Sequence, residues 1–241
     1  MKILLSIFCL LILVSCSDEP PPDGPYETFY ENGLTKSKGN HKNGVKDGLW
    51  VDYFENGQFS SIENYTNGKR DGLWEGYYEN GQLESRWNYN NGKLEGLSEF
   101  YYENGQLESS SNHKDGKYDG PWVEYYENGQ QEFEWNLKND VLEGPSVEFY
   151  ENGQLESKGE YRDGEKDGSW ILYYENGQLE SKEKYKKGIR VGLWEWYYEN
   201  GQLESRGYYR NGLRDGPWIM YHENGELVYN KNYKDGSWEK D

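Results

Sequence analysis

The chain has 241 residues, and its 44 acidic residues outnumber its 26 Lys and Arg residues, giving a formal net charge of −18 at pH 7. Nucleic acids and anionic lipid headgroups bind proteins through clustered Lys and Arg, so this composition disfavours both as partners. The 24 Tyr and 10 Trp residues supply more apolar surface than an acidic disordered tail carries, and they predict a folded protein.

The first fifteen residues are typical of a secretory leader. An apolar run from Ile3 to Val14 contains one Ser and is too short to span a bilayer. The four residues that end at Cys16 resemble the lipobox of bacterial lipoproteins, in which the Cys thiol is acylated and becomes the new N-terminus. We expect a lipoprotein signal peptide at 1–15, a lipidated Pro-rich tether at 16–25, and lipidation at Cys16. The alternative is an ordinary signal peptide with a chance Cys.

The residue after Cys16 bears on where the lipoprotein is delivered. In many two-membrane bacteria an Asp at this place retains a lipoprotein in the inner membrane, and this chain has Ser17 there. The resemblance therefore implies a lipid-anchored protein of the cell envelope, in the outer membrane and facing the periplasm or the cell surface. Cys9 leaves with the leader and Cys16 is acylated, so we expect no disulfide in the mature part.

The rest of the chain repeats with a period of 24 residues. A second glycine follows fifteen residues after each of the first eight Glu-Asn-Gly triplets, with no insertion in between. The triplets end at Gly33, Gly57, Gly81, Gly105, Gly129, Gly153, Gly177, Gly201 and Gly225.

Each repeat contains two Asn-Gly-like pairs, for example Asn80-Gly81 and Asn91-Gly92. Between alternating strands, such a pair predicts a two-residue type I′ turn, because both of its central residues need a positive φ angle. The predicted fold is all-β: an elongated, twisted, single-layer antiparallel meander of 24-residue hairpin repeats over residues 26–241. It should contain about eighteen strands in about nine repeats, the last of them truncated.

The predicted turns sort the side chains onto two faces, because alternate residues of a strand point to opposite sides of the sheet. A two-residue turn at Asn80-Gly81 pairs Trp74 with Trp87 and Glu75 with Arg86, and it also pairs Tyr78 with Leu83 and Tyr77 with Glu84. The buried face should carry Trp74, Tyr78, Leu83, Trp87 and Tyr89, and the other face should carry Leu73, Glu75, Tyr77, Glu84 and Arg86.

The pattern Tyr-x-(Asn/Asp)-Gly-x-x-Asp-Gly-x-Trp-x-x-Tyr-Tyr-x-Asn-Gly resembles the MORN repeat, and most of all its bacterial variant, over roughly residues 26–241. Proteins with this variant include ones labelled as YwqK-type antitoxins, and MORN arrays are membrane-associated scaffolds that bind proteins. The resemblance implies a repeat scaffold with a protein partner in the cell envelope. An antitoxin role would make that partner a toxin acting in the envelope.

A weaker resemblance is to the cell-wall-binding repeats of choline- and glucan-binding proteins, which also stack short hairpins around aromatic residues. It leaves open an alternative function, binding of a glycan or envelope polymer through the Trp and Tyr side chains. Ser98 and Ser146 interrupt the Trp positions on either side of the repeat that pairs Trp122 with Trp135. Small residues beside a Trp pair could open a groove in which a sugar ring stacks. Neutral drift in a redundant repeat is the simpler interpretation.

A column of aromatic residues beside a column of glutamates is the candidate site for a basic or amphipathic protein partner. The alternative is an ordinary solvated face with half-covered tyrosines. The aromatic members are Tyr101, Tyr125, Phe149 and Tyr173, and the acidic members are Glu108, Glu132, Glu156 and Glu180.

We expect no catalysis, cofactor or metal. His41, His113 and His222 lie in different repeats at positions that Tyr otherwise fills, which is typical of packing substitutions. The chain also has no nucleophile motif, phosphate-binding glycine loop or Cys/His metal spacing. We therefore predict a non-enzymatic scaffold.

Overall fold

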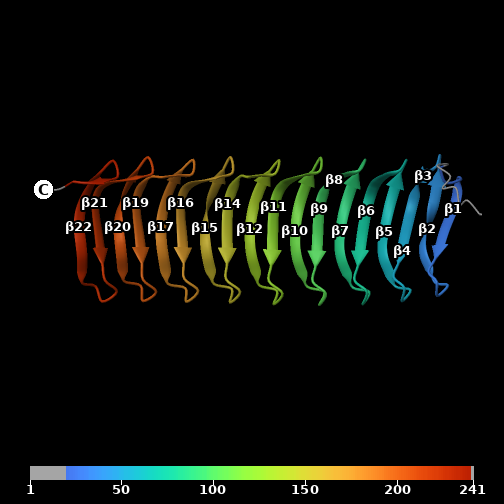
Figure 1. The fold of residues 1–241 in the computed structure, drawn as a ribbon, viewed down its shortest axis with the longest axis horizontal. Helices are drawn as coiled ribbons and strands as arrows, with labels where there is room; N and C mark the ends of the chain where they lie inside the picture. The colour runs from blue at the N-terminus through green and yellow to red at the C-terminus, as the bar shows by residue number, and fades with distance from the viewer. Residues whose placement is uncertain (1–19, 240–241) are drawn as a thin grey trace, which may run out of the picture.

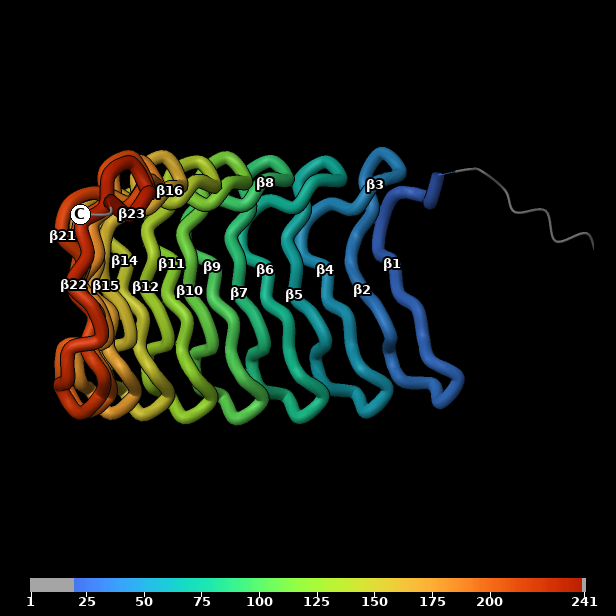
Figure 2. Tube along the Cα trace, turned by 60° about the vertical axis from the view of Figure 1, so that its left-hand side comes forward, coloured from blue at the N-terminus to red at the C-terminus, as the bar shows by residue number. Residues whose placement is uncertain are grey.

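The structure is a computed structural model that describes residues 20–239. Over this range the chain forms one open antiparallel sheet of 23 strands and no helix, which confirms the predicted fold class. The strands lie side by side in chain order along the long axis, with the turns along the two long edges (Figure 1). They bend along their length, and the row turns from one end to the other (Figure 2). The predicted leader and Cys16 lie outside the described residues.

Eighteen of the strands are the predicted hairpin strands, and five are two-residue strands that extend a turn. The two-residue strands are β3 (Val45–Lys46), β8 (Lys93–Leu94), β13 (Val141–Leu142), β18 (Ile189–Arg190) and β23 (Ser237–Trp238). The longer strands of the first half are β1 (Gly24–Phe29), β2 (Thr35–Lys42), β4 (Gly48–Tyr53), β5 (Phe59–Thr66), β6 (Lys69–Tyr77), β7 (Leu83–Asn90), β9 (Gly96–Tyr101), β10 (Leu107–Lys114) and β11 (Lys117–Tyr125). Those of the second half are β12 (Gln131–Lys138), β14 (Gly144–Phe149), β15 (Leu155–Arg162), β16 (Glu165–Tyr173), β17 (Leu179–Lys186), β19 (Gly192–Tyr197), β20 (Leu203–Arg210), β21 (Leu213–Tyr221) and β22 (Leu227–Lys234).

The two turns of a repeat differ in kind. At Asn91-Gly92 both φ angles are positive, 52° and 83°, as a type I′ turn requires. At Asn80-Gly81 the prediction of the same turn is wrong, because only Gly81 has a positive φ, of 88°. There Tyr78 pairs with Gln82 through its backbone N–H, which leaves a three-residue Glu-Asn-Gly loop with its glycine in the left-handed region.

The three-residue loop changes the register of the strands on either side of it. Trp74 pairs with Trp87 and Glu75 with Arg86, as predicted, but a β-bulge then pairs Tyr77 with Leu83 instead of Glu84. Paired residues lie on the same face of a sheet, so Leu83 lies on the face of Tyr77 and not, as predicted, on the face of Trp74. A bulge at the equivalent place accompanies each of these loops.

We call the two sides of the sheet the tryptophan face and the opposite face. The tryptophan face carries Trp50, Trp74, Trp122, Trp170, Trp194 and Trp218, and the opposite face carries Tyr53, Tyr77, Tyr101, Tyr125, Phe149, Tyr173, Tyr197 and Tyr221. Trp170 and Trp194 are 1% exposed although the sheet is a single layer. The core of the protein is therefore a strip of indole rings that runs along the tryptophan face.

Hydrogen bonds of the same two kinds join each repeat to the next one along the turn edge. The Asn80 side-chain amide donates to the Glu103 carbonyl, and the Tyr78 hydroxyl donates to the Tyr101 carbonyl at 2.6 Å. Phe54 has no hydroxyl and interrupts the second series. The aromatic column to which Tyr78 belongs was predicted as core, and these residues are half-buried instead because each hydroxyl reaches over to the next repeat. The other hydroxyl donors of the series are Tyr30, Tyr102, Tyr126, Tyr150, Tyr174 and Tyr198.

Candidate functional site

The indole rings of three repeats each lie flat over a glycine of the preceding strand. A Cβ atom built on Gly159 would lie 2.2 Å from the Trp170 ring, and one built on Gly207 would lie 2.1 Å from the Trp218 ring. The Trp170 indole N–H donates to the Glu160 carbonyl at 3.2 Å. Gly39 receives Trp50 in the same way, at 2.3 Å. Glycine at these places leaves the space that the ring occupies.

Two central repeats reverse this arrangement. The register of β12 with β14 pairs Phe133 with Glu148 and Glu134 with Val147, and the next step along it places Trp135 opposite Ser146. The register of β7 with β9 likewise places Trp87 opposite Ser98. The indole ring therefore comes from the preceding strand wherever the usual Trp position holds Ser. Each of these pairs still consists of one large and one small residue.

This exchange argues against a groove beside the Trp pair. Ser98 and Ser146 are 2% and 3% exposed, so neither opens the tryptophan face to a ligand. Trp122 and Trp135 are half-buried, with ring centroids 5.7 Å apart in an edge-to-face arrangement, and Trp135 stacks on Phe133 at 4.1 Å. The predicted groove is therefore absent at the two serines, because the space is filled by indole rings from the neighbouring strand.

The predicted aromatic and acidic columns lie on different faces. Leu107 pairs with Tyr101 and Ser109 pairs with Phe100, which makes Glu108 the extra residue of a bulge. Burial, and then repulsion by carboxylates that include Glu108, raises the pKa of Glu124 and of Tyr102, and both of these residues lie on the tryptophan side. The expectation that Tyr101, Tyr125, Phe149 and Tyr173 run beside Glu108, Glu132, Glu156 and Glu180 is therefore wrong. The bulge shifts the alternation by one residue.

The tryptophan face instead collects a central acidic row, which we define as Glu108, Glu124, Glu132, Glu148, Glu156 and Glu180. Burial raises the pKa of Glu124 first, and repulsion by Glu132 and Glu108 raises it further. The pKa of Glu156 is raised by burial and then by Glu148 and Glu180, and that of Glu180 mainly by burial. The carboxylates therefore stand close enough to repel one another.

No salt bridge in residues 20–239 involves a member of the central acidic row. Glu148 accepts hydrogen bonds from the Trp135 indole and the Ser157 hydroxyl, at 3.2 and 3.0 Å, and neither of these donors carries a charge. Earlier in the array Glu63 pairs with Arg70, and this contact contributes to lowering the pKa of Glu63. Glu84 and Glu204, at the same position in the repeats before and after the row, also form no salt bridge within residues 20–239, and Glu124 and Glu148 add a second carboxylate per repeat in the centre.

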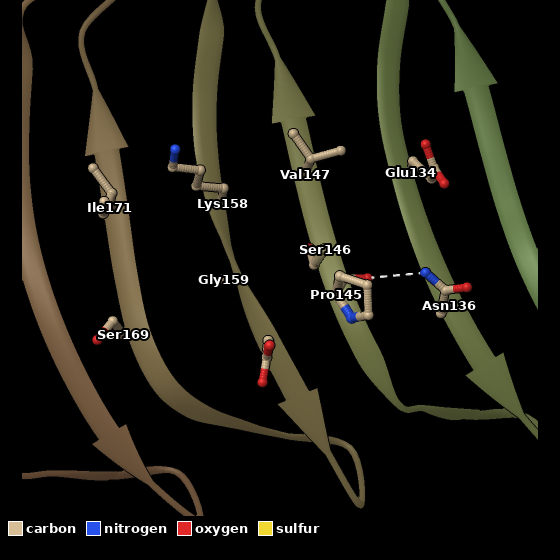
Figure 3. A pocket seen from close by; sticks show the side chains of 10 residues that line it. Glu134, Asn136, Pro145, Ser146, Val147, Lys158, Gly159, Ser169 and Ile171 are labelled. Atoms are coloured by element: carbon tan, nitrogen blue, oxygen red, sulfur yellow. Dashed lines mark hydrogen bonds between the residues drawn. The ribbon is translucent and has the colours of Figure 1, made fainter.

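The opposite face of the same repeats contains a groove of about 710 Å³. Figure 3 shows its two rows of side chains, with Glu134, Val147, Lys158 and Ile171 in one and Asn136, Pro145 and Ser169 in the other. The rows cross β12, β14, β15 and β16, and the backbone at Ser146 and Gly159 lies between them. Smaller grooves contain Gly39 and Gly207. Each of the three grooves thus lies behind a glycine that receives an indole ring on the tryptophan face.

The charge pattern of this groove also differs from that of the flanking repeats. Lys158 pairs across the strands with Val147 and Ile171, whereas Arg86 at the equivalent position lies between Glu75 and Glu99 and forms salt bridges with both. Burial and the Glu75 carboxylate raise the pKa of Tyr77 to about 12, so the phenol remains neutral in this cluster. Lys158 has no such partner, whereas Lys182, which lies between Ile171 and Glu195, keeps one salt bridge, to Glu195 at 3.6 Å.

His41 and His113 are buried in the repeat, as their positions predicted, whereas His222 is exposed beside a turn. His113 accepts or donates a 3.2 Å hydrogen bond with Ser98, and burial lowers its pKa. Within residues 20–239 no group of three or more His, Cys, Asp or Glu side chains is arranged to hold a metal ion. The same range contains no helix long and apolar enough to cross a membrane.

A family model described as the MORN repeat variant matches nine segments of the chain, which together cover most of it. The chain belongs to the MORN repeat variant family. The matched segments are 22–43, 46–67, 70–91, 94–115, 118–139, 142–163, 166–187, 190–211 and 214–235. A MORN repeat variant array is a tandem repeat scaffold, and here the match and the 24-residue meander describe the same units.

Other comparisons add little to this assignment. No curated protein matches the MORN repeat variant chain significantly. A chain of the crystal structure of TcdB2-TccC3-Cdc42 is 13% identical to it, with a TM-score of 0.22. That match covers 88% of this chain and 14% of the solved chain, and its TM-score is too low to carry an argument.

Proposed function

We propose that this protein is a non-enzymatic lipoprotein of the cell envelope that binds a basic protein partner along its central acidic row. The observation that carries the proposal is the row itself, which forms no salt bridge within residues 20–239 and in which burial and then neighbouring carboxylates raise the pKa of Glu124 and Glu156. A cationic partner would relieve this repulsion, and its binding would weaken as salt is added. The predicted leader at 1–15, with Cys16 directly after it, supports the envelope location.

The array suits such a partner because its charge is repeated at a fixed spacing. Glu132, Glu156 and Glu180 occupy the same position in successive 24-residue repeats, so each lies two strands from the next. Neighbouring strands are about 4.8 Å apart, which places these positions roughly 10 Å from one another along the sheet. An extended or helical segment with basic residues at a similar spacing would contact all three.

The decisive experiment is crosslinking in cells of the tagged full-length protein, followed by mass spectrometry of what co-purifies from the membrane. A triple variant with Glu132→Lys, Glu156→Lys and Glu180→Lys should lose a recurrent protein partner that salt also releases from the wild type. The matched control changes Glu31, Glu55 and Glu223 to Lys, since these residues are exposed in turns far from the row and alter the net charge equally. Equal loss of the partner in both triple variants would contradict binding along the row.

The alternative function, glycan binding on the tryptophan face, has less support. Sugar stacking needs an accessible ring face, and Trp170, Trp194 and Trp218 are only 1–2% exposed. The groove behind Ser146 and Gly159 contains no aromatic side chain in its lining. Retention on envelope polysaccharide, insensitive to salt and with no protein crosslinked, would nevertheless favour this alternative.

A further inference from the structure

The two ends of the described array expose side chains that are covered elsewhere. Phe29 and Leu227 are 59% and 58% exposed, whereas Tyr77 and Leu203 at the equivalent positions of inner repeats are half-buried. In inner repeats the two positions touch across neighbouring strands: Phe59, which is at the position of Leu227 and is 46% exposed, lies 6.1 Å from the ring of Tyr77, which is at the position of Phe29. Leu227 and Phe29 are therefore the two halves of a contact that inner repeats make.

Hydrogen bonding shows the same incompleteness at the C-terminal end. The side-chain amide of each earlier Asn of the Glu-Asn-Gly loops donates to a Glu carbonyl of the following repeat, as Asn200 does to Glu223. The Asn224 side chain accepts from the Glu226 N–H, but its amide has no partner within residues 20–239. On the open side of β22, only the two-residue strand β23 pairs with it, at Tyr233 and Lys234.

The repeat period makes the two ends fit each other. Residues 24–239 span nine whole periods of 24 residues, so a strand that continued the array after residue 239 would have the register of β1. We propose that a second copy of this chain adds its β1 to the open edge of β22, which joins the two sheets head to tail. The pairing of β5 with β6 gives the register by analogy, with Tyr229 opposite Thr28 and Asn230 opposite Glu27 of the other copy.

This union would complete the contacts that the ends lack. Phe29 would cover Leu227, and the Asn224 amide would reach the Glu31 carbonyl of the added copy. Lys231 would lie opposite Tyr26, which takes the Trp position of its repeat and is 39% exposed. Lys231 already contacts the Tyr229 and Trp238 rings at 5.1 and 4.3 Å, so a further ring beside it extends an existing cation–π contact.

One segment must move when the copies join. The stretch 20–23 of the added copy and the stretch 237–239 of the first occupy the same repeat positions. The former is held at the Gly44 turn, where the Asp23 carboxylate accepts from the Gly44 N–H. The latter is held by the short β23 pairing and by the Glu239 N–H, which donates to the Asn232 carbonyl at 3.0 Å. We expect β23 to yield, because its strand pairing extends over two residues only.

The contact joins two different edges, so it is not closed by a two-fold axis, and each added copy presents a new open edge. Such heterologous contacts generate filaments whose length grows with concentration. The expected assembly is a ribbon that lengthens along the axis of Figure 1 while its cross-section stays that of one sheet.

The test uses residues 17–241, which contain every described strand, studied by sedimentation velocity over a range of concentrations and by small-angle scattering. The wild type should form particles that lengthen with concentration at constant cross-section. Leu227→Lys should leave monomers, and so should Phe29→Glu. Mixing these two variants should restore assembly, because the new Lys and Glu face each other at alternate junctions.

Ile189→Lys is the matched control, since Ile189 is 50% exposed but lies in an inner repeat, and this variant should assemble like the wild type. A chain that ends at residue 236 should assemble at lower concentrations, because no β23 has to be displaced. A monomer at every concentration, a dimer that does not grow, or assembly unaffected by both end variants would overturn the proposal. Unchanged circular dichroism separates loss of assembly from loss of fold.

Discussion

The repeats around Trp170 and Trp218 and those around Ser98 and Ser146 meet the same packing requirement in opposite ways. In the former, glycine in one strand makes room for an indole ring that comes from the next strand. In the latter, the ring comes from the earlier strand and the serine opposite it is buried. The volume of the pair is therefore more tightly constrained than the identity of either residue, as expected for a close-packed interior.

Charge divides the array at different places from the packing of the indole rings. On the opposite face, Arg86 is held between Glu75 and Glu99, whereas Lys158 at the same position lies between two aliphatic side chains. On the tryptophan face, the central acidic row has no cationic partner in the described residues. Lys158 and the central acidic row thus carry charge without a salt bridge on the two faces of the sheet, and the proposed partner site rests on this observation.

The largest decrease in stability is expected when an indole ring that lies on a glycine is removed. Trp170→Ala should lower the free energy of unfolding by about 3–5 kcal/mol, because it removes a large buried side chain and leaves a cavity. Trp122→Ala should cost less, since Trp122 is half-buried. Chemical denaturation followed by circular dichroism measures both, and an equal cost would contradict the distinction between the two regions.

Exchanging the large and the small residue of one pair tests directly whether the volume of the pair, and not the identity of each residue, is constrained. Gly159→Trp should destabilise strongly on its own because the Trp170 ring occupies the space, and Trp170→Ser should leave a cavity. The double variant recreates the pairing of Trp135 with Ser146 and should recover part of the loss, with a coupling energy of roughly 0.5–3 kcal/mol in a double-mutant cycle. Additive losses would show that the two arrangements are not interchangeable.

The hydroxyl series along the turn edge should make a smaller contribution. Tyr150→Phe removes the 2.8 Å hydrogen bond to the Tyr173 carbonyl and should cost about 0.5–1.5 kcal/mol. The natural Phe54 indicates that the ring alone is compatible with the fold, so Phe54→Tyr is the reverse control and should stabilise. Hydrogen exchange at the affected turns reports whether the change is local. Protection that is unchanged in both variants would argue against the bond.

The smallest expected effect is electrostatic and depends on pH. The pKa values of Glu124, Glu156 and Glu180 are raised in the folded state, so the folded protein binds protons more readily than the unfolded chain does. Their contribution to stability is therefore present at low pH and is lost as the pH rises through the folded pKa values. Replacing all three by Gln should raise the melting temperature at neutral pH by about 1–3 °C after allowance for solvent screening.

The same triple variant should gain less than the wild type when the pH is lowered from about 7 to about 5. Glu63 has a lowered pKa and works in the opposite direction, since its contribution is lost as the pH falls. Glu63→Gln is therefore the control, and it should steepen the gain on acidification. An identical pH profile for all three proteins would contradict the repulsion within the central acidic row.

The period and the turn glycines were enough to predict the meander, and alternation predicted the pairs Trp74–Trp87 and Glu75–Arg86. The side of Glu84 and Glu108 was mispredicted because both Asn-Gly turns were given the same length. A signal for the difference was available in the sequence. The first turn has Asn in every repeat, and the side-chain amide of this Asn donates a hydrogen bond to the next repeat, as Asn80 does to the Glu103 carbonyl. The second turn also accepts Asp115 or Lys187, because this position requires only a positive φ angle.

The packing of the indole rings could also have been found in the sequence. The residue eleven places before each Trp or Ser of the Trp position is Gly39, Glu63, Trp87, Ser111, Trp135, Gly159, Glu183 or Gly207, and it is Trp where the later position is Ser. The groove and the absence of salt bridges in the central acidic row could not be read in this way. They depend on the bulge, which decides the face that each carboxylate occupies.

Site-specific photocrosslinking in cells tests whether the repeats that carry the central acidic row bind the proposed partner. A photoreactive residue would replace Gln130 or Gln154 in the central repeats, or Gln58 or Gln82 at the same exposed position of earlier repeats. We expect crosslinks to one recurrent protein from Gln130 and Gln154 but not from the other two positions. Equal yields at all four positions, or crosslinks from Gln58 and Gln82 alone, would contradict it.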